Sequence, residues 1–568
     1  MKLINLLLIV AVVSSCKSGL DEEKIREARY DEIRIGGELK ERIHRNYDRM
    51  EGSKYLPENL FLTLEESGWW PGDTEGRTIL ALVLDAQATG REPKTLEAIM
   101  TRFPTMLNTA GYFGLIPPDS LVDEQQLSGN GWVLRALCEY YLWKKDEQTL
   151  EYIHTMIDNL ALRTRGFHNQ YPIDPSLRSL TGEAIGTRIQ KTLNGWILST
   201  DIGCDFVFLD GLVQAYEVTG REDLLPVIDE IIALYQRIDV EKIKAQLHST
   251  LTGTRAVLRY YNITGDESLL QMAIERYETY MKRAITENYE NYNWFGRPEW
   301  TEACAVLDSY MIAVQLWKYT GNPAYLADAQ HIYYNGVCFA QRVNGGFGSS
   351  NCCGAKEQKS VQVFIYEGHW CCSMRGGEGL SCVAKYTAFV QTNRVALTNL
   401  VSGGYALQLE NGKANFTIDT DYPFANEAKV VFQNDIKNMT FSFFRPAWMT
   451  DVRVFVNGKT LVTKEENGFV VVSGSRKKND VLDISFNQQA IASDAENPNA
   501  MKSVHKYRYG PLVLGHVGGN IETLPKDAVI EKTGRQSFRV GNQPMTTVYH
   551  LMSPEVNYPF AIQILFNK

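Results

Sequence analysis

A short phrase, an apolar helix closed by threonine and glycine, recurs through the first two thirds of the chain. In each copy the glycine stands where the helix should stop and the backbone must turn left-handed, and a second helix follows. Internal repeats of this length predict stacked helix pairs, each of which buries its apolar face against the next. Clear copies end at Thr89-Gly90, Thr219-Gly220, Thr264-Gly265 and Thr320-Gly321, and a looser copy covers Ala136–Asp146.

The number of these repeats predicts the shape of the helical part. Five pairs, together with the helix expected over Glu22–Arg49, give roughly a dozen helices, the number that closes an (α/α)6 toroid. We therefore expect a barrel of this kind over residues 31–384. Because a toroid carries its long loops at one mouth, we also expect the functional site there.

The pattern changes near Lys385 from helical spacing to alternating apolar runs. Val452–Val456 and Phe469–Val472 are two such runs, and Asn467-Gly468 is one of the Asn-Gly pairs that separate them. Asn-Gly between apolar runs is the strongest short-range signal for a hairpin. We expect residues 385–568 to form one β-sandwich or two small ones. The predicted fold class is thus α+β multidomain, an (α/α)6 toroid (barrel) followed by β-sandwich domains.

The first residues are typical of an export signal. Lys2 precedes the apolar run Leu3–Val13, and two serines then lead to Cys16. The run is too short to span a bilayer, and small residues directly before a cysteine resemble the bacterial lipobox, in which Cys16 would carry the lipid. Residues 1–16 are the expected signal segment and residues 17–30 a polar tether. The alternative is an ordinary signal peptide that happens to contain a cysteine.

This start predicts an exported lipoprotein in the periplasm or at the outer membrane and cell surface of a bacterium, attached to the membrane only through Cys16. The formal net charge of -9 comes from interspersed acidic and basic residues, so no basic stripe for nucleic acid is present. Several tryptophans stand beside glycine, proline or acidic residues, as in Trp70-Pro71-Gly72. Such rings suit sugar faces, although core packing explains a single tryptophan equally well.

Cysteines are unusually arranged for an exported protein, where disulfides would be the ordinary interpretation. The chain has 10 of them, so removal of Cys16 leaves an odd number. Four of the remainder form the adjacent pairs Cys352-Cys353 and Cys371-Cys372. Adjacent cysteines rarely bridge each other, because the linkage strains the peptide between them. A thiolate site for a metal is the better interpretation.

Metal-binding residue types concentrate between Glu287 and Glu378. Glu302 and Cys304 offer a carboxylate and a thiol two residues apart, and Cys371-Cys372 offers two more thiols. Three sulfurs and one oxygen satisfy tetrahedral zinc without any histidine. Each part alone is weak, because Glu-x-Cys occurs by chance and a cysteine pair can be buried as small apolar residues. Cys352-Cys353 is the rival pair.

These motifs, in this order, resemble glycoside hydrolase family 127, the β-L-arabinofuranosidases and their relatives. The resemblance extends over nearly the whole chain beyond the signal segment. It is carried by Thr301–Ala305, Tyr334–Val337, Trp370-Cys371-Cys372, Phe443–Trp448 and Arg508–Leu514.

The resemblance implies that zinc is held by Glu302, Cys304, Cys371 and Cys372, and that Cys371 is also the nucleophile. A metal removes the thiol proton and keeps the thiolate ready for the anomeric carbon. A thioglycosyl intermediate would follow.

The general acid implied by the family is a carboxylate upstream of the zinc motif. Glu287 lies at nearly the family spacing, and Glu290 is the alternative. Such a group would protonate the leaving oxygen and later deprotonate water, which gives retention of configuration. The structural alternative for Glu287 is a solvated loop carboxylate.

The sugar pocket departs from the family pattern. Family members line it with several histidines, whereas this sequence keeps His248 and places Trp132 and Asp205 where two others would stand. Some relatives act on aceric acid of rhamnogalacturonan II, and Arg375 could meet the carboxylate of such a sugar. The structural alternative is that Arg375 is tied to a helix end or to an acid of the protein. Substrate contacts are therefore expected at His248, Trp132, Asp205 and Arg375.

The sequence predicts a retaining exo-glycoside hydrolase that removes a terminal pentofuranoside-type sugar, β-L-arabinofuranose or a related one, from plant pectic glycans. An aceric acid hydrolase is the second prediction. Two other classes stay open, a lipid-anchored glycan-binding protein and a polysaccharide lyase. The first has no use for a thiolate metal site, and the second needs a tyrosine or histidine base and releases unsaturated sugar that absorbs ultraviolet light.

Overall fold

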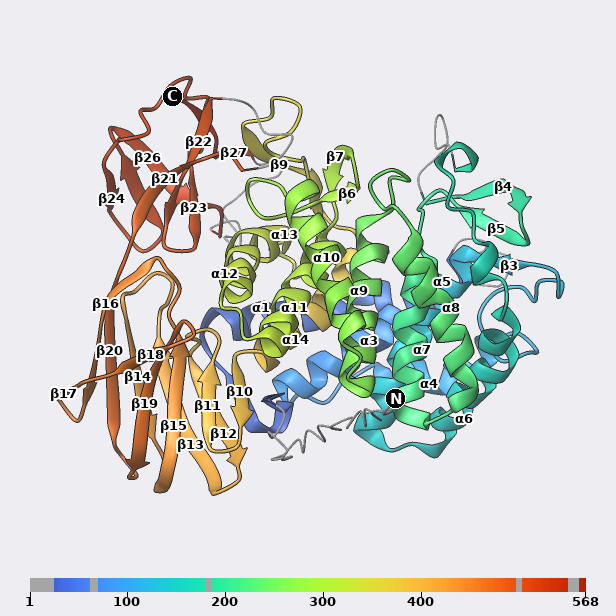
Figure 1. Cartoon of the computed structure of the whole chain (residues 1–568), viewed down its shortest axis with the longest axis horizontal. Helices are drawn as coiled ribbons and strands as arrows, with labels where there is room; N and C mark the ends of the chain where they lie inside the picture. Colours follow the sequence, from blue (N-terminus) through green and yellow to red (C-terminus); the bar gives the residue numbers. More distant parts are fainter. Residues whose placement is uncertain (1–24, 62–69, 179–185, 497–502, 550–560) are drawn as a thin grey trace, which may run out of the picture.

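The computed structural model describes residues 25–61, 70–178, 186–496, 503–549 and 561–568 (Figure 1). The expected signal segment, the lipidation site Cys16 and most of the expected tether lie outside these ranges. Within them, no helix combines the length and the apolar character that crossing a membrane requires.

Inner helices form a closed ring in the described part of the chain. Each packs on the next in sequence order, and the last packs back on the first. Most residues of these helices are buried, because each helix faces neighbours on both sides and the ring axis on the third. They are α3 (Asp73–Thr89), α5 (Glu124–Lys144), α7 (Asp205–Thr219), α9 (Leu247–Thr264), α11 (Ala303–Thr320) and α14 (Cys372–Lys385).

Outer helices alternate with the inner ones along the chain and bury only one stripe each. In α10 the stripe runs through Leu269, Ala273, Tyr277 and Tyr280, at the three- to four-residue spacing of one helix face. The expected (α/α)6 toroid is confirmed. The outer helices are α1 (Gly37–Met50), α4 (Leu96–Arg102), α6 (Glu147–Met156), α8 (Leu225–Arg237), α10 (Glu267–Arg283) and α12 (Ala324–His331).

The Thr-Gly repeat marks the ends of inner helices, as expected. The glycine after each of α3, α7, α9 and α11 is left-handed, a conformation that residues with a Cβ adopt at a cost. The φ angles are 67° at Gly90, 66° at Gly220, 70° at Gly265 and 69° at Gly321.

Charged side chains fill the axis of the ring. Arg135 of α5 donates to the Glu378 carboxylate of α14 at 2.7 Å, and Arg255 of α9 donates to Asp308 of α11 at 2.9 Å. Arg375 of α14 contacts both acids, and Arg255 also contacts Glu378. These side chains are almost completely buried, so the pairs cross-link four inner helices in a medium where charges need partners.

After α14, every further element in the described residues is a strand. Two sheets face each other, and the rings of Phe416 and Phe441 meet between them with centroids 5.6 Å apart. The expected sandwich is therefore present. The first sheet has the order β1-β10-β11-β15-β19-β18, and the second β17-β16-β20-β14-β13-β12-β2. Their bounds are β1 (Arg26–Glu27), β2 (Ile33–Ile35), β10 (Ala388–Gln391), β11 (Arg394–Leu397), β12 (Gly403–Leu409), β13 (Gly412–Thr420), β14 (Glu427–Phe432), β15 (Ile436–Phe444), β16 (Met449–Val456), β17 (Lys459–Leu461), β18 (Lys464–Glu466), β19 (Phe469–Arg476) and β20 (Val481–Gln488).

A third sheet follows with a small core of its own, so the second expected β unit is also present. It lies beside the end of the barrel near α12 and α13 (Cys338–Ala340) (Figure 1). Its strands are β21 (Ala490–Asp494), β22 (Val504–Tyr509), β23 (Leu512–Gly515), β24 (Ile530–Lys532), β25 (Ser537–Val540), β26 (Gln543–Thr547) and β28 (Phe566–Asn567).

The start of the described chain corrects one expectation. The single helix expected over Glu22–Arg49 is wrong over residues 25–36, because β1 (Arg26–Glu27) and β2 (Ile33–Ile35) precede α1, and residues 22–24 lie outside the described ranges. These strands pair with β10 and β12, so each sandwich sheet takes an edge strand from the beginning of the chain. The period-two burial of Ile33 and Ile35 around exposed Arg34 is the local sign of this strand. The boundaries at residues 31 and 385 stay predictions.

Short strands precede four of the inner helices and gather at one end of the ring. Figure 1 shows β6, β7 and β9 together at this end, and ring contacts between β7 and β9 agree. The loops thus collect at the helix N-termini, which we call the mouth. The strands are β3 (Val122–Asp123), β4 (Arg188–Leu193), β5 (Trp196–Ser199), β6 (Tyr292–Trp294), β7 (Arg297–Thr301), β8 (Ser349–Ser350) and β9 (Ser360–Ile365), with β27 (Ala561–Gln563) paired to β9.

Candidate metal centre

Two adjacent inner helices bring the expected ligands together at the mouth. Glu302 is the residue before α11 and Cys304 lies in its first turn, whereas Cys371 precedes α14 and Cys372 begins it. The helix N-termini carry partial positive charge from their unpaired N–H groups. That charge favours a carboxylate and thiolates at this position.

The four side chains form one compact cluster. Their ligand atoms all lie within 4.8 Å of one another. The Glu302 carboxylate oxygen Oε1 is 3.3 Å from the Cys372 Sγ and 4.0 Å from the Cys371 Sγ, and the two sulfurs are 3.3 Å apart. Tetrahedral zinc with Zn–S bonds of about 2.3 Å holds its sulfur ligands roughly 3.8 Å apart, so small movements fit this donor set to a metal. The grouping is confirmed, and the identity of the metal stays a prediction.

The three thiols of the cluster differ in acidity. Hydrogen bonds from Cys304 and Cys372 lower the pKa of the Cys371 thiol to about 6. Burial raises the pKa of Cys304, and hydrogen bonds with the other two thiols raise the pKa of Cys372. Cys371 is also half-buried whereas the other three residues are buried. The most acidic and most accessible sulfur is therefore that of Cys371.

An arginine behind the cluster was not anticipated from the sequence. The guanidinium of Arg77, on α3, donates to the Cys304 Sγ at 3.7 Å and to Asp73 at 2.7 Å, and lies 4.6 Å from the centroid of Trp132. A cation here offsets the charge that three thiolates and a carboxylate would gather. The local signal was the Asp73–Arg77 spacing of four residues, which places both side chains on one helix face.

Trp132 and His248 lie next to this arginine, as neighbours of the cluster. Their rings stack with centroids 5.6 Å apart and an interplanar angle of 15°. Burial, together with Arg77 and Arg375, lowers the pKa of His248, so its imidazole is neutral near pH 7. The structure thus brings two of the expected substrate contacts together. Both are buried, and their contact with sugar stays a prediction.

Arg375 is held by acids of the protein. Its guanidinium pairs with Asp308 and Glu378 and lies 4.5 Å from the centroid of Trp132. This is the structural alternative that the sequence left open. The guanidinium is 1% exposed, so a sugar carboxylate would have to displace an existing partner.

Asp205 lies in a different buried group of side chains. Its carboxylate oxygen Oδ2 is 2.8 Å from the His168 Nδ1, and the His168 Nε2 is 2.9 Å from the Thr164 Oγ1. Among the described residues, its hydrogen bonds do not connect it to the thiol cluster. In the described part of the chain, the hydrogen bonds of Asp205 thus lead to His168 and Thr164 and not to Trp132 or His248.

Glu287 is tied to the third sheet. Its Oε2 accepts from the Lys506 Nζ at 2.7 Å, and its Oε1 accepts from the backbone N–H of Glu496 at 2.8 Å. It is buried, so the alternative of a solvated loop carboxylate is wrong.

Glu290 has a different environment from Glu287. Asn288 donates to its carboxylate at 2.8 Å and Thr301, the neighbour of Glu302, donates at 3.1 Å. Burial raises the pKa of Glu290 to about 7. A carboxyl group that is half protonated near neutral pH can both donate and accept a proton.

The other cysteines do not join the cluster. Cys352 and Cys353 are buried, and Cys353 donates to the carbonyl oxygen of Gln358 at 3.5 Å. The rival pair is thus not a ligand pair in the metal-binding group that the described residues form. All nine cysteines in the described ranges are free thiols, in agreement with the interpretation against disulfides.

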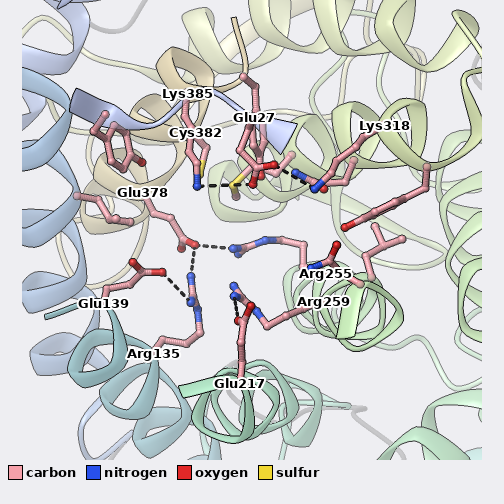
Figure 2. Close-up of a pocket in the computed structure, with 18 residues that line it drawn as sticks. Glu27, Arg135, Glu139, Glu217, Arg255, Arg259, Lys318, Glu378, Cys382 and Lys385 are labelled. Carbon is pink, nitrogen blue, oxygen red and sulfur yellow. Dashed lines mark hydrogen bonds and ion pairs between the residues drawn. The ribbon is translucent and has the colours of Figure 1, made fainter. Parts of the chain in front are cut away.

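A cavity of about 180 Å³ lies at the opposite ends of the inner helices (Figure 2). Figure 2 shows its charged side chains in pairs, with Glu378 between Arg135 and Arg255. Glu27 of β1 pairs with Lys318 at 3.0 Å and covers this end. Because these groups already neutralise one another, the thiol cluster at the mouth is the stronger candidate for chemistry.

Comparisons with known proteins agree with this fold. Residues 399–488 match the family model described as the beta-L-arabinofuranosidase GH127 middle domain, which corresponds to strands β12 to β20. A search of curated protein sequences finds no match to this chain.

Solved structures share the architecture over almost the full length. One titled a GH127 beta-arabinofuranosidase is 14% identical with a TM-score of 0.70, over 96% of this chain and 98% of that chain. One from Geobacillus stearothermophilus T6, titled a GH127 beta-L-arabinofuranosidase, is 14% identical with a TM-score of 0.70, over 94% and 99%. A third, titled glycoside hydrolase, is 13% identical with a TM-score of 0.71, over 96% and 98%.

At these identities the solved structures establish the fold, and the family model identifies the domain that follows the barrel. The resemblance that the cysteine motifs indicated is confirmed on both grounds. Residues 399–488 resemble the middle domain of glycoside hydrolase family 127, and the described chain shares the fold of solved structures titled as GH127 beta-arabinofuranosidases.

Proposed function

We propose that the protein is a retaining exo-glycoside hydrolase that removes a terminal β-L-arabinofuranose or a related pentofuranoside, with Cys371 as nucleophile. One observation carries the proposal: three thiols and a carboxylate converge at the N-termini of α11 and α14, at the mouth of a GH127 fold. The donor set fits zinc, and Glu302, Cys304, Cys371 and Cys372 would hold it. Bound zinc would keep these thiols deprotonated at neutral pH.

The reaction then proceeds in two displacements. The Cys371 Sγ attacks the anomeric carbon, a C–S bond forms, and the C–O bond to the leaving group breaks while a carboxylic acid protonates the departing oxygen. The same carboxylate next removes a proton from water, which attacks the anomeric carbon and releases the thiolate. Two inversions give net retention of configuration.

The surroundings of the two candidate acids favour Glu290 over Glu287. Glu290 has its pKa raised to about 7 by burial, and one hydrogen bond joins it to Thr301 beside the cluster. Glu287 is instead paired with the Lys506 ammonium at 2.7 Å and accepts a hydrogen bond from the backbone N–H of Glu496, so its carboxylate is engaged by the third sheet. We therefore assign the acid and base role to Glu290 and keep Glu287 as the alternative.

The substrate that we propose is a plant pectic glycan, met outside the cytoplasm by a lipoprotein anchored through Cys16. The sequence pattern before Cys16 supports the anchor. Removal of aceric acid remains the second candidate for the sugar, although the Arg375 guanidinium expected to bind its carboxylate already pairs with Asp308 and Glu378.

The test measures monosaccharide release from β-L-arabinofuranosides and from pectic side chains, with the anomer of the first product followed by NMR. We expect L-arabinose with retained configuration, and loss of turnover in Cys371→Ser. Cys382→Ser is the matched control, because Cys382 is a half-buried thiol in the last turn of α14. Near-normal activity of Cys371→Ser would contradict the nucleophile assignment. Unsaturated product absorbing ultraviolet light would indicate a lyase, and binding without product a glycan-binding protein.

A further inference from the structure

Aromatic side chains lead into both ligand-bearing segments at the mouth. Trp300 lies two residues before Glu302, and Trp370 lies directly before Cys371. Phe364, on β9, stacks on Trp300 with ring centroids 5.6 Å apart and an interplanar angle of 12°. These contacts join β7 and β9, the two strands that precede α11 and α14. Trp300 and Trp370 are therefore each separated by at most one residue from a ligand of the thiol cluster.

Two rings of this group are half exposed. Phe364 is 52% exposed and Trp370 is 50% exposed, whereas Val361 and Val363 of the same strand are buried. The alternation of β9 explains why Phe364 points outward. Large aromatic faces exposed beside a reactive site are typical of ligand-binding grooves, since exposure of such area is otherwise unfavourable.

Rigid contacts hold the rings in place. The rings of Trp300 and Trp294 pack edge to face with their centroids 4.9 Å apart, and the indole N–H of Trp294 donates to the Asp201 carboxylate at 3.0 Å. The loop before Trp370 is fixed where the Tyr55 hydroxyl donates to the carbonyl oxygen of His369 at 2.8 Å. Aromatic surfaces held on fixed supports lose little freedom when they bind a ligand.

We propose that Trp300, Phe364 and Trp370 form a stacking platform for the sugar residues on the leaving-group side of the scissile bond. The proposal rests on the proposed hydrolase function and narrows its substrate class. The terminal sugar must reach the Cys371 sulfur, so the rest of a glycan extends outward over the rim where these rings lie. A sugar ring presents a flat C–H face to an aromatic ring and hydroxyls to water, which suits rings that are half exposed. The preferred substrate is thus an oligosaccharide or polysaccharide end, and a glycoside with a small aglycone is a poor substrate.

Phe364→Ala tests the platform, because Phe364 is not adjacent to a metal ligand. Two substrates are compared, methyl β-L-arabinofuranoside and a β-L-arabinofuranosyl trisaccharide; an aryl glycoside is avoided because its own ring would stack. We expect kcat/KM for the trisaccharide to fall about five- to tenfold relative to the methyl glycoside, since loss of one aromatic contact has that effect. Phe364→Tyr should restore the ratio. Trp143→Ala, at the far end of α5 from the mouth, is the matched control and should leave the ratio unchanged.

An equal effect of Phe364→Ala on both substrates, or the same ratio in Trp143→Ala, would overturn the platform. If no arabinofuranoside is cleaved, the hydrolase proposal fails, and the platform is then tested alone by affinity electrophoresis in gels that contain pectic arabinan. Retardation of the wild type that Phe364→Ala abolishes and Trp143→Ala keeps supports the platform without the hydrolase. Migration of the wild type unaffected by the glycan would refute it.

Discussion

Replacement of Glu378 by glutamine should strongly destabilise the barrel. The carboxylate lies on the ring axis, where Arg135 donates to it at 2.7 Å and both Arg255 and Arg375 contact it. The variant keeps the shape of the side chain and removes its charge. Three arginines are then left with one fewer acid in a buried setting.

The magnitude follows from the geometry. One ion pair at 2.7 Å contributes about 6 kcal/mol of Coulomb energy at an effective dielectric constant of about 20. Part of this loss is offset, because burying a neutral glutamine avoids the desolvation penalty of the carboxylate, which is several kcal/mol for a buried charge. The net loss in the free energy of unfolding should therefore be about 3–5 kcal/mol, the range expected when one partner of a buried pair is removed.

Urea unfolding followed by circular dichroism at 222 nm measures this loss, because the helices of the described chain lie in the barrel. Glu465→Gln is the matched control, since Glu465 pairs with Arg445 at 2.6 Å but is 47% exposed. The control should change the free energy of unfolding by less than about 1 kcal/mol.

The reasoning is refuted if Glu378→Gln and Glu465→Gln lose similar stability. That result would mean that the axial arginines are not charged groups in need of a buried partner. A second variant, Glu378→Asp, keeps the charge and shortens the reach, and it should recover part of the lost stability.

Three further predictions concern the metal cluster, the acid and the helix caps. Arg77→Met should speed the loss of metal to a chelator and weaken metal affinity about 10- to 100-fold, because residues that contact metal ligands help to set the affinity of the site. Unchanged metal affinity would show that Arg77 does not support the ligands. Burial raises the pKa of Glu290 to about 7, so the protonated form that acts as the acid is present below that pH and kcat/KM should fall as pH rises through about 7. Glu290→Gln should remove this fall from the pH profile of kcat/KM. A variant with an unaltered pH profile would assign the acid and base role to Glu287. Gly321→Ala should cost about 1–2 kcal/mol, since the φ of 69° strains any residue with a Cβ, whereas equal stability would show that the cap relaxes.

The repeated helix caps were predictable because they are local. A glycine that ends a helix at Gly220 or Gly321 acts through its own backbone, and the sequence motif carries that information. The strand at Ile33–Ile35 was not predictable in the same way. Its partner is β12, far along the chain, and two alternating isoleucines beside a helical pattern do not specify a distant partner.

The candidate site shows the same division. Glu302, Cys304 and Cys371-Cys372 were identifiable because metal ligands at helix starts leave short motifs. Lys506, which pairs with Glu287, lies in the third sheet, and no local sequence motif predicts that the two residues meet. Charges such as Asp308 and Glu378 look like surface residues until the ring closes and places them on its axis.

The pairing of β2 with β12 also constrains the order in which the protein can assemble. Residues 33–35 leave the ribosome long before residues 403–405 exist to pair with them. At a synthesis rate of about 5–20 residues per second, the early strand waits roughly 20–75 s for its partner. Its unpaired edge is exposed during that time to any other extended chain, a known route to aggregation. Closure of the sandwich is therefore a late event in folding. A chain that ended before β12 would have an unpaired, aggregation-prone strand at β2 beside an otherwise complete helical ring.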